Sequence, residues 1–160
     1  TLYPDTILKF GGHAMAAGLT IHQDNFLRFQ KLFDETINEF ADPTLLQDVI
    51  YTDGELQGNE FNLDVVTRLR NAGPWGQHFP EPMFEGDFRV LQQKLVGGKH
   101  LKLMIENAHG MLFDAIWFNI DLRAYPDLSI QRAHIVYKLE MNEFRGNIGL
   151  QLQIEHLYAI

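Results

Sequence analysis

The residues best suited to chemistry near the amino terminus form the run FGGHAMAAG, residues 10–18. Glycines expose peptide N–H groups and let a phosphate or another backbone approach closely, and a neighbouring histidine can donate a hydrogen bond to a phosphate oxygen. Gly11, Gly12 and His13 are therefore candidates for binding a nucleic-acid backbone. The alternative is structural: the glycines make tight turns, the alanines allow close packing, and His13 is partly buried with its polar atoms satisfied. The residues alone favour this alternative.

A second candidate is a basic segment in an acidic chain. The net charge of −8 argues against a surface that is basic throughout, but residues 86–102 carry four cations against one carboxylate. The cations are Arg89, Lys94, Lys99 and Lys102. Strand alternation predicts Lys102 on the face opposite Leu101 and Leu103, and the tight turn GGK sets two strands side by side. Lys94, Lys99 and Lys102 are then expected on one outer surface, although ordinary solvated hairpins also carry lysines.

Metal-ligating and catalytic patterns are weak. His13, His22 and Asp24 fit no common zinc spacing, so no metal site is expected in this chain. Short-range acidic pairs such as Asp53 with Glu55 are usually solvated, and we assign them no catalytic role. The chain has no cysteine, which excludes disulfides and thiolate catalysis and makes the reducing cytoplasm the expected location.

Length and composition limit the architecture. A chain of 160 residues with 46% hydrophobic content can bury one sizeable core or two small ones. Apolar runs such as MLFDAIWFNI are broken by charge well short of the about 20 residues that span a bilayer, so no membrane role is expected. The sequence begins at Thr1 and reaches its densest motif by residue 11, and we expect it to be a piece of a longer protein.

The first half of the chain predicts two strands, two helices and a rigid turn. AAGLTI indicates a short strand, and apolar residues at helical spacing predict a helix over residues 23–40, ended by ADPTLLQD. A domain boundary is expected near residues 42–48. VIYTDGEL predicts a strand, residues 62–70 a short helix capped by Asn62, and NAGPWGQHFPEPMF a structured turn.

From Phe84 onward the pattern has period two and predicts about five strands. They are expected in FEGDFRVLQQKLV, HLKLMIEN, MLFDAIWFNI, AHIVYKLEMN and NIGLQLQIEHL. Many short strands with few helices indicate a small closed barrel. Phe88, Trp117 and Phe118 are candidates for stacking on bases, but alternation sends one residue of each neighbouring pair inward, so the core is expected for most of them.

Longer motifs add a family resemblance. GGHAMAAGLTI followed by an amphipathic helix resembles the DHHA1 motif of the DHH phosphoesterase superfamily. AGPWGQHFPEPMFEG, GGKHLKLMIEN and NEFRGNIGLQLQIEHL together resemble the carboxyl-terminal barrel of the RecJ family of single-stranded-DNA-specific exonucleases. The resemblance covers nearly the whole chain and implies an α+β fold. The implied fold consists of an incomplete α/β DHHA1 subdomain at about 1–47, followed at about 48–160 by an OB-like antiparallel β-barrel with a preceding helix.

The resemblance implies a function. The chain would be the substrate-binding half of a 5′-to-3′ exonuclease of DNA repair and recombination. In that family Asp and His clusters of an amino-terminal domain hold divalent metal ions, and no such run occurs here. Mg or Mn is therefore expected in the intact enzyme, with no cofactor and no nuclease activity in this fragment. Single-stranded DNA is the expected partner, with single-stranded-DNA-binding protein or a helicase as further candidates.

The resemblance also bears on single residues. It shifts preference to a phosphate contact for Gly12 and His13, with Gly18 left to packing. Arg145 matches a family arginine whose planar fork suits phosphate, with pairing to a carboxylate as the alternative. Trp75 and His78 stand where a Phe and an Asn are commoner in the family. Their turn is therefore expected chiefly to brace the barrel, with a DNA contact by Trp75 as a second role.

Two other functions stay open. Another DHH phosphoesterase, such as an oligoribonuclease or a cyclic-dinucleotide hydrolase, shares the glycine–histidine motif but does not need the barrel. Alternatively, the barrel is a protein-docking module that recruits other repair proteins.

Overall fold

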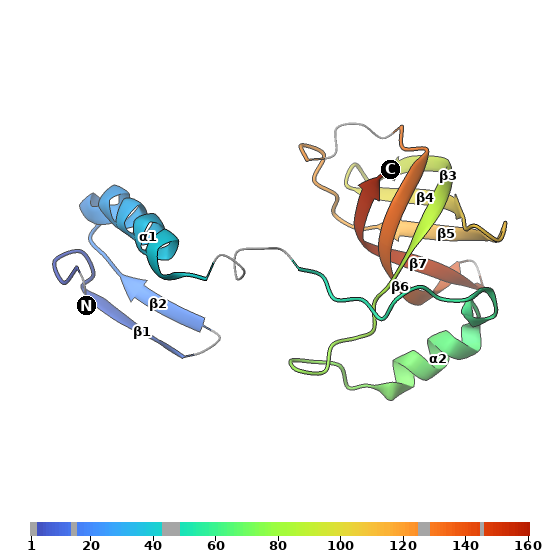
Figure 1. Ribbon diagram of the computed structural model, residues 1–160, viewed down its shortest axis with the longest axis horizontal. Helices are drawn as coiled ribbons and strands as arrows, with labels where there is room; N and C mark the ends of the chain where they lie inside the picture. Colours follow the sequence, from blue (N-terminus) through green and yellow to red (C-terminus); the bar gives the residue numbers. More distant parts are fainter. Residues whose placement is uncertain (1–2, 14–15, 43–48, 125–128, 145) are drawn as a thin grey trace. The chain divides into compact units, whose positions relative to one another are not determined.

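The computed structural model describes residues 3–13, 16–42, 49–124, 129–144 and 146–160. The chain divides into two compact units, Thr1–Ile50 and Tyr51–Ile160, which are considered separately (Figure 1). The boundary expected near residues 42–48 falls mainly on residues outside this description. No helix in the described part of the chain is long and apolar enough to cross a membrane.

The first unit is a β-hairpin with one helix. Strands β1 (Lys9–His13) and β2 (Ala16–Thr20) pair antiparallel, with Gly11 opposite Gly18. The short 3-10 helix η1 (Gln23–Asn25) leads into α1 (Phe26–Phe40), which lies alongside the hairpin in Figure 1. The strand and the helix expected here are confirmed. The tight turns considered for the glycines are wrong, because all three lie within strands.

The second unit begins with an irregular segment, where a strand was expected. Residues 49–57 form no strand, because Gly54 has a φ of 90° and interrupts the extended backbone after one short pairing. Asp53 N donates to Met83 O at 2.7 Å, and Glu85 N donates to Gly54 O at 3.1 Å. The Asp53 carboxylate also accepts from Met83 N, so it has a structural role.

A helix and a turn precede the barrel, as the sequence predicts. After η3 (Gly58–Glu60), helix α2 (Leu63–Ala72) is capped by Asn62, whose side chain accepts from Val65 N at 2.9 Å. The turn that follows is closed by reciprocal backbone hydrogen bonds between Gly76 and Phe79, at 2.8 and 3.0 Å. Its Trp75 ring packs on Phe79 with centroids 4.8 Å apart.

The five remaining strands form the expected closed barrel, in the order β3-β4-β5-β7-β6. They are β3 (Phe84–Val96), β4 (His100–Glu106), β5 (Leu112–Trp117), β6 (Arg132–Phe144) and β7 (Asn147–Ala159). All neighbours pair antiparallel except β5 and β7, which are parallel. The expectation of a wholly antiparallel barrel is therefore wrong at this pair, because strand direction cannot alternate all the way around a closed ring of five.

The core fills the barrel with the inward residues of each strand. In β4, Leu101, Leu103 and Ile105 are fully buried, whereas Lys102 between them is exposed, as alternation predicts. Phe88 and Trp117 also lie in the core, as expected. Tyr137 is buried among aromatic rings, and burial raises the pKa of its phenol. Helix α2 adds Val66 to the core.

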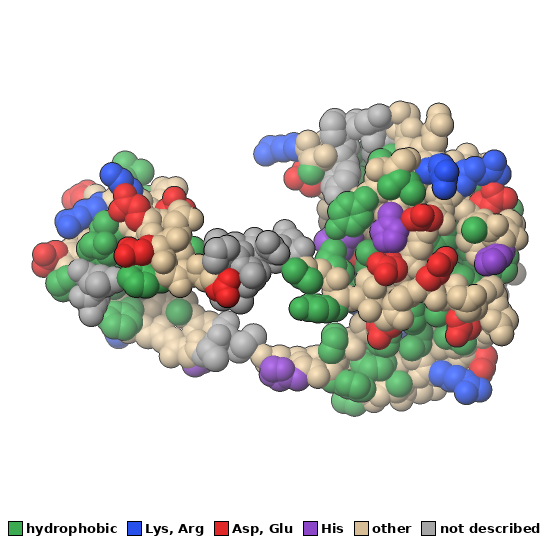
Figure 2. Space-filling model, viewed as in Figure 1, with side chains coloured by type: hydrophobic (Ala, Val, Ile, Leu, Met, Phe, Trp, Pro, Cys, Tyr) green, Lys and Arg blue, Asp and Glu red, His purple; other side chains and the backbone are tan. Residues whose placement is uncertain are grey.

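The outer surface of β3, β6 and β7 carries ion pairs. His134 Nδ1 lies 2.7 Å from Asp87 Oδ1, and its Nε2 lies 3.4 Å from Glu85 Oε2. The hydrogen bond to Asp87 is the largest cause of a raised pKa of His134, with a further contribution from Glu85. Farther along β6, Lys138 Nζ lies 2.9 Å from Glu81, which raises the pKa of that lysine. Figure 2 shows acidic and histidine side chains gathered on one face of the barrel unit.

The core predicts a stability difference between two leucines. Leu103→Ala should lower the free energy of unfolding by about 2 to 5 kcal/mol, because it removes buried methyl groups and leaves a cavity. Leu112→Ala, at a residue 58% exposed on β5, should change it by less than about 0.5 kcal/mol. Urea denaturation measures both variants. Equal destabilisation by the two would contradict the assignment of inward and outward faces.

The His134 cluster predicts a pH-dependent stability. A histidine whose pKa is raised in the folded state adds stability that is fully present below its unfolded pKa of about 6.5 and is lost as pH rises through the folded value. His134→Gln should therefore destabilise the chain more at about pH 5.5 than at about pH 8.5. His109→Gln, in the exposed turn 107–110, is the control. A His134→Gln effect that does not vary with pH would show that the histidine contributes no charge.

Candidate nucleic-acid interface

The outward side chains of the carboxyl-terminal half of β3 and of β4 and β5 make one surface, here called the basic face. Lys94 on β3 lies directly across from Lys102 on β4, and both are exposed. A shallow groove of about 620 Å³ runs between these strands. Its lining is Gln92, Gln93, Lys94, Lys102, Leu103, Met104 and Asp114. The arrangement expected for these two lysines is confirmed.

The GGK turn holds Lys99 at the edge of the basic face. Gly97 and Gly98 have φ values of 60° and 70°, which residues with a Cβ rarely adopt. Lys99 N donates to Val96 O at 3.3 Å and closes the turn. Two left-handed residues match the right-handed twist of the flanking strands, so this turn fixes the register that sets Lys94 opposite Lys102.

The cations of this region differ in their partners. Lys102 Nζ lies 3.5 Å from Asp114 Oδ1 on β5, with both side chains nearly half exposed. Arg89 Nε donates to Glu106 Oε2 at 2.8 Å. Within the described ranges, no carboxylate lies within ion-pair distance of Lys94 or Lys99. A polyanion would thus meet Lys94 and Lys99 without displacing a carboxylate of the chain.

Two rings meet on the basic face: Phe118, a stacking candidate from the sequence, and His100, which the sequence did not indicate as a site residue. Phe118, just after β5, is 48% exposed, although Trp117 beside it is buried. Its ring contacts His100 on β4 with centroids 5.2 Å apart. The signal was present, since the alternation that places Lys102 outward places His100 on the same side.

The other predicted site residues do not join the basic face. Arg89 lies at the point where the pairing partner of β3 changes from β6 to β4, and the residue opposite it on β6 is Arg132. Trp75 lies half-buried in the turn before β3. Arg145 falls outside the described residues. The glycine–histidine motif lies in the first unit.

In that motif the glycines differ. A Cβ at Gly12 would lie 2.8 Å from Ala16 O and from Ala17 Cα across the hairpin, so hairpin pairing alone requires glycine there. A Cβ at Gly11 or Gly18 would meet no described atom within 4 Å, so no packing in this part of the chain requires glycine at either position. His13 is exposed at the end of β1.

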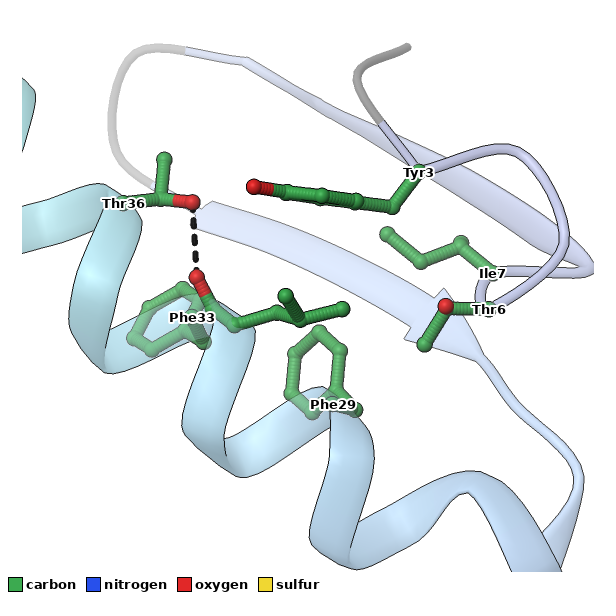
Figure 3. A pocket seen from close by; sticks show the side chains of 7 residues that line it. Tyr3, Thr6, Ile7, Phe29, Phe33 and Thr36 are labelled. Carbon is green, nitrogen blue, oxygen red and sulfur yellow. Dashed lines mark hydrogen bonds between the residues drawn. The ribbon is translucent and has the colours of Figure 1, made fainter.

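The first unit also has a pocket of about 200 Å³ between its amino-terminal segment and α1 (Figure 3). Tyr3, Ile7, Phe29 and Phe33 line it, and the Thr36 hydroxyl beside them donates to Leu32 O at 2.6 Å. This lining is mostly apolar, and its polar side-chain groups are the hydroxyls of Tyr3, Thr6 and Thr36. Among the described residues of the whole chain, no group of three His, Asp or Glu side chains could hold a metal ion.

Comparisons with known proteins agree on one family. The model of the RecJ OB domain matches residues 52–156. The chain is 52% identical to the single-stranded-DNA-specific exonuclease RecJ of Haemophilus influenzae, over 99% of this chain and 28% of that protein. It is 51% identical to RecJ of Escherichia coli, over 100% of this chain and again 28% of the relative. The chain therefore spans less than a third of the length of these relatives.

A solved structure agrees in fold. The crystal structure of RecJ from Thermus thermophilus in complex with Mg²⁺ superposes with a TM-score of 0.71 at 21% identity, over 96% of this chain and 23% of that one. The same protein in complex with Mn²⁺ gives a TM-score of 0.72. The resemblance to the RecJ family is confirmed, and with it the OB-type barrel: the chain belongs to the RecJ family, and its second unit carries the RecJ OB domain.

Proposed function

We propose that this chain is the substrate-binding part of a RecJ-type exonuclease and that its basic face binds single-stranded DNA. The observation that carries the proposal is the pair Lys94 and Lys102. Like charges directly opposite each other on neighbouring strands are destabilising, and only Lys102 has a carboxylate partner in the described part of the chain. A phosphate between the two ammonium groups would relieve their repulsion.

The geometry favours a single strand over a duplex. OB-folds bind oligonucleotides on their second and third strands and on adjoining loops, which correspond to β4, β5 and the GGK turn. A positive groove with exposed rings suits unpaired bases, since every base offers a face for stacking. The names of the relatives, single-stranded-DNA-specific exonucleases, support the same substrate.

The first unit would contribute a second contact. We assign it to a DHHA1 subdomain, with Gly11, Gly12 and His13 holding the phosphate backbone of the substrate. The exposed His13 and the open space beside Gly11 support this role, whereas Gly12 is already explained by the hairpin. We also propose DNA contacts by Arg89, Arg145 and Trp75. The structure supports these less than the lysines, because Arg89 is paired with Glu106 and Trp75 is half-buried.

Phosphodiester hydrolysis would need residues beyond this chain. The relatives of known structure were crystallised with Mg²⁺ or Mn²⁺, but the described residues here do not fit a metal site. We therefore propose that the metal is held elsewhere in a longer protein, and that this part captures and orients the strand. Such an enzyme would act in the cytoplasm in DNA repair and recombination, where single-stranded-DNA-binding protein or a helicase could supply its substrate.

The lysine pair predicts a salt-dependent binding defect. Lys94→Ala or Lys102→Ala should weaken binding to oligothymidylate and reduce the slope of log affinity against log salt by roughly 0.7 for each phosphate interaction removed. Fluorescence anisotropy over a range of salt concentrations measures both quantities. Lys31→Ala, at an exposed lysine of the first unit, is the control and should change neither.

Asp114→Asn gives the complementary variant. It removes the carboxylate that competes for Lys102, so it should tighten binding. If the triple variant Lys94→Ala, Lys99→Ala, Lys102→Ala stays folded and binds with unchanged affinity and salt slope, the basic face does not bind DNA. The protein-docking function of the barrel would then be favoured.

The absence of a metal-ligand cluster among the described residues predicts that the chain is inactive by itself. Incubation of the 160-residue chain with end-labelled single-stranded DNA and Mg²⁺ or Mn²⁺ should yield no cleavage products. The contrary result would be metal-dependent products that disappear when a residue of this chain, such as His13, is replaced by alanine.

A further inference from the structure

We infer that Phe118 and His100 form a stacking site for one unpaired nucleobase at the GGK end of the basic face. The inference rests on the proposed DNA binding and deepens it, because it adds a contact to a base to the contacts with phosphates. The sequence made Phe118 one of three stacking candidates, with the core expected for most of them, and gave His100 no role in binding.

The two rings leave an aromatic surface open to solvent. Their planes are inclined at 79°, so they meet edge to face and do not cover each other as a parallel stack would. Phe118 is 48% exposed, while the neighbouring Trp117 is 9% exposed and fills the core. An unpaired base could therefore lie against Phe118 without displacing any core residue.

The site is held in place before a ligand arrives. Asn119 N donates to His100 Nδ1 at 3.1 Å, which makes Nδ1 the unprotonated nitrogen of the neutral ring. Asn119 has a φ of 52°, and this left-handed residue turns the chain directly after Phe118. Ile120 N then donates to Lys99 O at 2.9 Å. Side chains held in this way lose little rotamer freedom on binding.

The surroundings favour a nucleotide over an apolar partner. Lys99 directly precedes His100 in the turn, and Lys102 lies two residues farther along the outward side of β4. Across the β3–β4 pair, His100 faces Val96, and Lys102 faces Lys94. An exposed ring bordered by cations matches a base that is attached to a phosphate backbone.

The test compares two oligomers with the same number of phosphates, oligothymidylate of about 15 nucleotides and a fully abasic strand of the same length. In the 160-residue chain, Phe118→Ala should weaken binding to oligothymidylate about tenfold and leave binding to the abasic strand unchanged. Lys102→Ala should weaken binding to both. Tyr158→Ala is the matched control, because this aromatic residue is 50% exposed on β7, outside the basic face.

A second variant guards against misfolding. Phe118→Trp should bind oligothymidylate at least as tightly as the wild type, and the fluorescence of the new tryptophan should be quenched by oligothymidylate and not by the abasic strand. Two results together would overturn the stacking site. Phe118→Ala would weaken binding to the two oligomers equally or weaken neither, and the fluorescence of Phe118→Trp would not be quenched by oligothymidylate. If the lysine variants still weaken binding in that case, the proposed function stands and only this inference fails.

Discussion

Closure of a ring of five strands is the constraint on which the rest of this structure depends. Because five is odd, one neighbouring pair must be parallel, and the chain places it between β5 and β7. Strand β3 completes the ring by pairing with β6 through its first half and with β4 through its second half, and the two pairings meet at Arg89. A bulge between Val90 and Gln92 follows that point, where an extra residue bends the strand.

The division of β3 also separates the charges of the barrel. Its first half carries Glu85 and Asp87, which pair with His134 on β6. Its second half carries Lys94, which faces Lys102 on β4. One strand thus contributes an acidic surface on one side of the bulge and a basic surface on the other. A chain with a net charge of −8 can in this way present a local surface suited to phosphate.

Local patterns were enough to predict most of the fold and the orientation of Lys102. Strand alternation, the cap at Asn62 and the glycine turn act over a few residues, and each was confirmed. The parallel pair was not predicted, because it depends on the order of strands around the ring. The strand expected over residues 49–56 failed because Gly54 adopts a left-handed conformation. The dipeptide Asp53–Gly54 is itself a turn signal, which the strand prediction did not weigh.

The candidate site was predicted only in part, for the same physical reason. The local excess of cations predicted a binding surface at Lys94, Lys99 and Lys102. The carboxylate partner of each cation, however, depends on strand pairing. Pairing places Asp114 beside Lys102 and Glu106 beside Arg89. The contact between Phe118 and His100 depends on the pairing of β5 with β4, and the need for glycine at position 12 depends on the hairpin register.

Nuclear magnetic resonance mapping of bound DNA tests the central claim most directly, that single-stranded DNA lies on the outward side of β4 and β5. Amide shifts of the ¹⁵N-labelled chain would be followed during titration with oligothymidylate. DNA bound on this side should cause the largest shifts in the GGK turn, from His100 to Met104 and around Phe118. Shifts concentrated on the acidic surface of the first half of β3 and around His134 on β6, or no shifts in the barrel at saturating DNA, would contradict it.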